Sequence, residues 1–207
     1  MVALSNLRSH FNSQLCVTLP IPTKSFANQT IIITGSNTGM GLEAARYLVR
    51  LGAAKVILAV RSLPRGQAAA ESILASEKRP GVVEVWELDL ARYASVEAFA
   101  QRVYQTLPRL DVVVANAGVF HFKFEMAEQD EANITVNVVS HMLLALLLLP
   151  KLRETAAMTG KAGVFTFTGS FTHWMTEFPE RRSENIFRDL AVKEKARMGE
   201  QRLVLLN

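Results

Sequence analysis

Three glycines follow a strongly apolar, β-branched run near the start of the chain. Residues 31–33 are isoleucines, Thr34 comes next, and glycines stand at 35, 39 and 41. The β-branched run predicts a buried strand, and glycine permits both a tight turn and close approach of the backbone to a ligand. A helix that begins at the turn would direct its free N–H groups and positive dipole end at an anion.

This spacing predicts a strand–turn–helix unit that holds the pyrophosphate of a dinucleotide. The alternative is an ordinary corner between a strand and a helix, which the features further along the chain disfavour. The turn residues that we expect to contact the ligand are Gly35, Ser36, Asn37, Gly39, Met40 and Gly41.

A second apolar run, residues 56–60, ends at Arg61. Arg61 lies about 20 residues beyond Gly41, where NAD-binding chains usually carry an acid that binds the ribose 2′-hydroxyl. A guanidinium cannot accept that hydrogen bond, but it can pair with a 2′-phosphate through charge-assisted bonds. We therefore expect NADP(H) rather than NAD(H). Arg65 either adds a second positive charge or is a solvated turn residue, and the sequence favours neither.

Strand and helix patterns alternate along the rest of the chain. Further strands are expected at 82–90, 110–115 and 163–168, and helices at 67–78, 95–106 and 131–149, with Ser95 as a helix cap. This alternation predicts the α/β class, as one doubly wound parallel sheet of Rossmann type. Residues 1–27 are expected to be a lead-in and 28–207 the single domain. Only five strands are found, so the domain looks truncated after the fifth, which would lie near an exposed edge.

The motifs taken together resemble those of the short-chain dehydrogenase/reductase family, and in finer detail a fungal branch similar to retinol dehydrogenases and WW-domain oxidoreductases. The resemblance covers about residues 28–170. It is carried by Thr34-Gly-x-x-x-Gly39-x-Gly41, Asp89-Leu90, Asn116-Ala117-Gly118, Asn137-x-x-x-His141 and Ser170-x-x-His173-Trp174.

The resemblance implies roles for four residues. Asp89 would contact the adenine ring, and Asn116 would steady the central strand beside the cofactor. Asn137 would be the active-site asparagine that helps hold a proton-relay water, and Ser170 the catalytic serine that binds the substrate oxygen. Taken without the motifs, Asn137 could be an uncommitted polar residue of a helix and Ser170 a helix or turn cap.

The family also uses a tyrosine followed four residues later by a lysine, and here the sequence departs from its pattern. Tyrosines occur only at 47, 93 and 104, and none of them follows Ser170. The resemblance suggests that this segment is missing between Arg202 and Leu203. Two interpretations remain open. The first is an NADP(H)-dependent oxidoreductase acting on a small-molecule alcohol or carbonyl, and the second is a catalytically inactive remnant that binds only a dinucleotide or a protein partner.

Composition narrows the other possibilities. A net charge of +4 with interleaved signs argues against nucleic-acid binding, and the lone Cys16 allows no internal disulfide. The histidines at 121, 141 and 173 lack the clustering of metal ligands, so we expect no metal site. The apolar run 142–149 is too short to span a bilayer, so we expect no transmembrane segment, a cytoplasmic location and, from the family, a possible homodimer.

Overall fold

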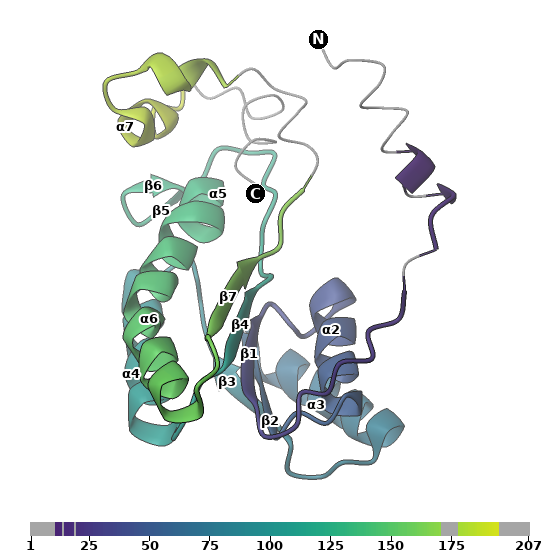
Figure 1. Ribbon diagram of the computed structural model, residues 1–207. Helices are drawn as coiled ribbons and strands as arrows, with labels where there is room; N and C mark the ends of the chain where they lie inside the picture. Colours follow the sequence, from purple (N-terminus) through teal and green to yellow (C-terminus); the bar gives the residue numbers. More distant parts are fainter. Residues whose placement is uncertain (1–10, 14, 19, 171–177, 195–207) are drawn as a thin grey trace.

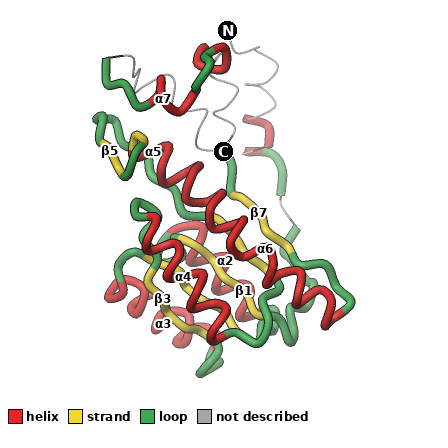
Figure 2. Tube along the Cα trace, turned by 90° about the vertical axis from the view of Figure 1, so that its left-hand side faces the viewer, coloured by secondary structure: helices red, strands yellow, loops and turns green. Residues whose placement is uncertain are grey.

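A five-stranded parallel sheet with helices on both faces forms the body of the molecule (Figures 1 and 2). The computed structural model describes residues 11–13, 15–18, 20–170 and 178–194. The strands of the sheet are β1 (Thr30–Thr34), β2 (Lys55–Val60), β3 (Val83–Glu87), β4 (Val112–Ala115) and β7 (Val164–Phe167). Their order is β3-β2-β1-β4-β7, so the chain moves outward from β1 in one direction and then, from β4, in the other.

Two helices cover each face of this sheet (Figure 1). One pair is α2 (Gly39–Arg50) and α3 (Leu63–Glu77), and the other is α4 (Tyr93–Thr106) and α6 (Ser140–Thr159). The remaining elements are α5 (Ala132–Ile134), the π-helical turn η1 (Thr135–Val139), the small hairpin β5 (Met126–Ala127) and β6 (Asp130–Glu131), the 3-10 turn η3 (Pro179–Arg182) and α7 (Ile186–Leu190). The expected doubly wound α/β fold is therefore confirmed.

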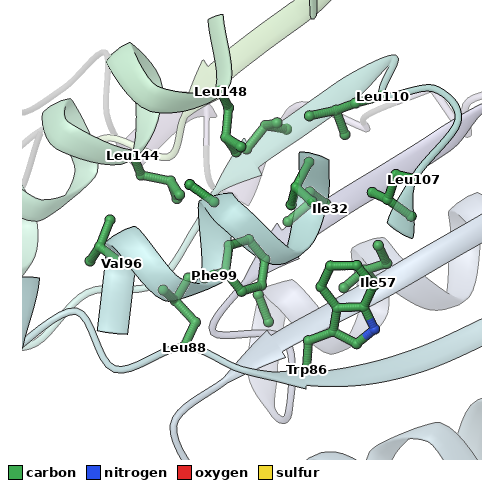
Figure 3. Packing of buried hydrophobic residues seen from close by; sticks show 14 of the residues in the cluster. Ile32, Ile57, Trp86, Leu88, Val96, Phe99, Leu107, Leu110, Leu144 and Leu148 are labelled. Carbon is green, nitrogen blue, oxygen red and sulfur yellow. The ribbon is translucent and has the colours of Figure 1, made fainter. Parts of the chain in front are cut away.

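Alternation along the strands divides the core into two layers. Ile31 and Ile33 of β1 pack with the buried side chains of α2 and α3, whereas Ile32 between them packs on the α4 and α6 side. Figure 3 shows that second layer, in which Ile32 and Ile57 lie near Phe99 and Trp86. Because β1 is apolar on both faces, it can only be a central strand, and this fixes the sheet around it.

The edge strand β7 is much less covered than the centre of the sheet. Val164 is 47% exposed and Phe167 is 42% exposed, whereas all five residues of β1 are buried. This confirms the expectation that the fifth strand lies at an exposed edge.

Several expected boundaries were wrong for identifiable reasons. Helix α3 begins at Leu63 rather than Gln67, because Pro64 is well suited to a first helical turn. Strand β3 ends at Glu87, although the Leu88 N–H still donates to the Val60 carbonyl at 3.0 Å. Ser95 is not the cap of α4, because Arg92 occupies that position and the Ser95 hydroxyl instead accepts the Asp89 backbone N–H at 3.0 Å.

The long helix also differs from the expectation in shape and length. It bulges into a π-helical turn at 135–139 and continues past Pro150 to Thr159. Pro150 is tolerated because the carbonyl that loses its partner belongs to Leu146, which is 70% exposed and can bind water. The helical segment Ala132–Thr159 has the length and mean hydropathy, 1.9, of a membrane-crossing helix, yet half of its apolar window is buried inside the protein.

One buried hydrogen bond attaches α6 to the segment after β3. The Ser140 hydroxyl donates to the Leu90 carbonyl at 2.6 Å, and both residues are buried. Ser140→Ala should lower the free energy of unfolding by about 1–3 kcal/mol, because the buried carbonyl loses its donor. The matched control is Thr106→Ala, since the exposed Thr106 hydroxyl donates to the Arg102 carbonyl. If urea unfolding gave the same loss of unfolding free energy for both variants, the buried Ser140 bond would contribute no more to stability than the exposed Thr106 bond.

Candidate functional site

The site lies where β1 and β4 end side by side, at the point where the strand order reverses. Ligands of open α/β sheets bind in the crevice outside the carboxyl ends of the strands at such a point. Two adjoining cavities are found there, of about 290 and 220 Å³, and Ala117 and Gly118 line both.

The turn after β1 has the close packing that its glycines predicted. Gly35 has a φ of +63°, and a Cβ on it would lie 2.7 Å from the Ala117 Cα. A Cβ on Gly41 would lie 2.5 Å from the Asn116 side-chain nitrogen and 2.8 Å from the Gly35 carbonyl oxygen. A side chain at either position would force the two strand ends apart. Gly39, with a φ of +57°, faces open space instead.

Helix α2 starts at this turn with its N-terminal N–H groups uncovered by a side chain. Thr38 occupies the cap position and makes no side-chain capping bond, and the first turn carries no acidic residue. Ser36 is buried, and its hydroxyl donates to the Ile33 carbonyl at 2.8 Å, so it stabilises the turn from inside. Asn37 lines the larger cavity and Met40 the smaller one.

Thr34 joins the ends of β1 and β4. Its hydroxyl oxygen accepts the backbone N–H groups of Asn116 at 3.0 Å and Ala117 at 2.9 Å. The Asn116 side-chain amide donates back to the carbonyls of Thr34 at 3.1 Å and Gly35 at 3.4 Å. Asn116 therefore holds the turn together, and sequence reasoning missed Thr34 as the residue that satisfies its backbone.

The larger cavity has both basic and acidic residues in its lining. Arg61 follows β2 directly and lines it, as do Asp89, Glu125 and His121. Asp89 is held in place by the Ser95 hydroxyl at its N–H and by a 3.0 Å bond from the Ala91 N–H to its carboxylate. Arg65 lies in the first turn of α3, is exposed, and is not among the residues that line this cavity.

The smaller cavity is lined by Asn137, His141 and Ser170, together with Asn116 and Met40. The Asn137 amide accepts the Val119 N–H at 2.9 Å and donates to the Val119 carbonyl at 2.8 Å, which uses one of its two N–H groups and one of the two lone pairs of its oxygen. It thus holds the segment after β4 against the π-helical turn. Ser170 comes from the chain that leaves β7.

His141 is a buried member of this group that sequence reasoning did not place. Its Nε2 lies 3.4 Å from the Thr34 hydroxyl, and burial lowers the pKa of its imidazole. His173 and Trp174, which the resemblance also pointed to, lie outside the described residues. Among the residues that the structure describes, no three His, Cys, Asp or Glu side chains gather as metal ligands would.

All three tyrosines lie on helices and outside the lining of both cavities. Tyr47 is on α2, and Tyr93 and Tyr104 are on α4, where Tyr104 donates to the Leu147 carbonyl at 3.0 Å. None of the three lines either cavity. A tyrosine acid beside Ser170 is therefore not supplied by this stretch of sequence.

Comparisons with known proteins agree with the geometry. A sequence model described as short chain dehydrogenase matches residues 29–175. A short chain dehydrogenase/reductase of Cryptosporiopsis sp. is 51% identical over 170 residues, which make up 82% of this chain and 52% of that protein. The chain spans about half the length of the curated relatives it matches.

Solved structures show the same fold with dinucleotides bound. A short chain dehydrogenase from Escherichia coli CFT073 complexed with NADPH is 31% identical, with a TM-score of 0.60 over 80% of this chain and 66% of that one. A 3-ketoacyl-(acyl-carrier-protein) reductase from Brucella melitensis complexed with NADH is 26% identical, with a TM-score of 0.58 over 72% of this chain and 60% of that one. With the family model matching more than half of its residues, this chain belongs to the short-chain dehydrogenase/reductase family.

Proposed function

We propose that the chain binds NADP(H) and forms the dinucleotide-binding part of an oxidoreductase acting on a small-molecule alcohol or carbonyl. The observation that carries the proposal is the glycine turn, which packs against Asn116 and Ala117 while Gly39 leaves open space in front of the uncapped α2. This arrangement fits a pyrophosphate, because backbone N–H groups and a helix dipole face the space that the anion needs.

The two cavities divide the dinucleotide between them. The adenosine half belongs in the larger cavity, where Asp89 would meet the adenine and Arg61 the 2′-phosphate. The nicotinamide half belongs near Asn137, His141 and Ser170. When bound there, the nicotinamide supplies or accepts a hydride, and Ser170 would orient the substrate oxygen through its hydroxyl.

A binding role without efficient turnover is the second candidate, and the placement of the tyrosines favours it. All three lie on α2 or α4, so the chain offers no phenol to pass a proton to a substrate held by Ser170. General acid–base catalysis typically contributes about 10²–10⁴-fold. Titration with NADPH, followed by assay of its oxidation with a panel of aldehydes and ketones, separates binding from turnover. Failure to bind NADPH or NADH would overturn both candidates.

Arg61 should decide the choice between the two nicotinamide cofactors. Arg61→Asp should weaken NADPH binding by about tenfold or more and leave NADH binding nearly unchanged, because a charge-assisted pair is worth about 1–3 kcal/mol. Isothermal titration with each cofactor measures the ratio. Arg65→Asp is the matched control, with the same change in charge outside the cavity lining. An equal effect of both variants would assign the preference to general electrostatics rather than to Arg61.

Gly41 should be essential for the turn itself. Gly41→Ala places a Cβ within 3.0 Å of Asn116 and Gly35, so it should lower stability and weaken NADPH binding by more than tenfold. Gly81→Ala is the control, because Gly81 has a positive φ of 77° in open space far from the turn. It should cost about 1 kcal/mol of stability through backbone strain and leave NADPH affinity unchanged. Unaltered binding by a folded Gly41→Ala protein would contradict the proposed phosphate contact.

We also propose a homodimer through the outer face of α6, where Met142, Leu146 and Leu149 are 50%, 70% and 40% exposed. Exposed apolar residues that line up on one helix mark an interaction surface. Leu146→Glu should convert the dimer to a monomer in size-exclusion chromatography with light scattering. Leu74→Glu, at a comparably exposed leucine on α3, should not. A parent protein that is monomeric at micromolar concentration would rule the proposal out.

A further inference from the structure

The Thr34 hydroxyl has three polar neighbours and only one proton to give. Its oxygen accepts the N–H groups of Asn116 and Ala117, and the third neighbour is the His141 Nε2 at 3.4 Å. Thr34 is fully buried and His141 is 3% exposed. A hydroxyl group has two acceptor lone pairs and one donor proton.

This count fixes the direction of the third bond. Both lone pairs of the Thr34 oxygen face backbone donors, so its proton is the only group left to meet the imidazole. The His141 Nε2 must then be the acceptor, and it carries no proton. The neutral ring therefore holds its proton on Nδ1.

The backbone of the preceding turn is consistent with this tautomer. His141 follows the π-helical turn, and the backbone of Val136 and Asn137 in that turn raises the pKa of its imidazole against the larger lowering by burial. A backbone group with this effect favours the protonated ring, as a carbonyl oxygen beside a ring nitrogen does. An Nδ1–H that donates to a carbonyl of this turn completes the hydrogen bonding of the imidazole. The Phe167 ring packs edge-on to the imidazole, at 6.5 Å between centroids.

We propose that His141 is a positioning residue, a neutral Nδ1–H imidazole that ties the helical turn carrying Asn137 to the Thr34 joint beneath the dinucleotide. In this role His141 acts through its contacts with other residues of the protein and not through a contact with the ligand or the substrate. The proposal has two parts. The effect of His141 on NADPH binding rests on the proposed function, whereas the tautomer of its ring does not.

The joint that His141 supports is shared by both cavities. Thr34 holds Asn116 and Ala117, and Ala117 lines the cavity on each side. The same helical turn presents the Asn137 amide that holds Val119. Without an acceptor at the Nε2 position, the Thr34 hydroxyl would turn its proton to another acceptor. It would then hold the backbone of residues 116–119 less firmly.

The tautomer can be read directly by nitrogen NMR of the imidazole rings at neutral pH. The chain has only four histidines, so His141→Gln identifies the His141 signals by their disappearance. We expect one ring nitrogen with the shift and proton coupling of an Nδ1–H and one with those of a bare Nε2. A protonated Nε2, or an imidazolium with protons on both nitrogens, would overturn the proposal whether or not the protein binds a dinucleotide.

Two variants test the positioning role. His141→Leu removes the acceptor, whereas His141→Gln can return an oxygen acceptor near the Nε2 position. NADPH binding should weaken by about tenfold in His141→Leu and recover to within about threefold of the parent in His141→Gln. Equal affinities for parent and His141→Leu would overturn the role, and so would equal losses in the two variants.

A double-mutant cycle of His141→Leu with Thr34→Val separates the hydrogen bond between these two side chains from general packing. The cycle is measured by thermal unfolding midpoints, so it needs no cofactor. His141→Leu should lower the midpoint less in the Thr34→Val background than in the parent, because the hydroxyl that needs the acceptor is already gone. Additive losses would show that the two residues act independently and would contradict the proposal. Should His141→Leu fail to fold, His141→Ala, which also lacks the acceptor, takes its place in the cycle, and the nitrogen spectrum of the parent protein still decides the tautomer.

Discussion

The site depends on the Thr34 hydroxyl group, which takes the place of backbone hydrogen bonds where the pairing of β1 and β4 ends. The regular pairing of these strands ends at Ile33 with Val114, and the next N–H groups of β4 point at a chain that has already turned away. Buried N–H groups need acceptors, and the Thr34 oxygen supplies one for Asn116 and Ala117 together. The sheet thereby keeps its order for two residues beyond its last backbone bond. Of those two residues, Asn116 lines the smaller cavity and Ala117 lines both.

The glycine turn follows from the same constraint. Once Asn116 and Ala117 are fixed against Thr34, they occupy the space into which side chains at 35 and 41 would project. Glycine at these positions is thus required by the neighbouring strand, in addition to any approach by a ligand. Gly39 differs, since its positive φ and open surroundings are a matter of turn conformation. Two of the three glycines therefore serve packing, and the third leaves room.

The sequence predicted those parts of the fold that depend on local pattern. Strands such as 31–33 were found because apolar β-branched runs must be buried. Arg61 was proposed from its distance beyond Gly41, whereas Asp89 was proposed only from the family resemblance. Ser95 shows where local reasoning failed, since its position resembled a cap and its hydroxyl instead holds the Asp89 backbone. The bond between Ser140 and Leu90 joins residues 50 positions apart in the sequence, and the Thr34 hydroxyl likewise meets backbone groups of the distant Asn116 and Ala117. No spacing rule encodes such pairs, so they became visible only in three dimensions.

The chemistry of the smaller cavity follows from which of its groups can hold a proton near neutral pH. Asn137 is committed to the Val119 backbone, and an amide is no acid. Burial lowers the pKa of His141, and in the tautomer that we propose its Nε2 already accepts a bond from Thr34. Ser170 holds its proton far too tightly to release it at neutral pH. None of the described side chains that line this cavity is therefore a proton donor of matched pKa. The dinucleotide binding and substrate orientation that we propose need only groups of this kind, whereas the transfer of a proton needs a group that the described lining does not contain.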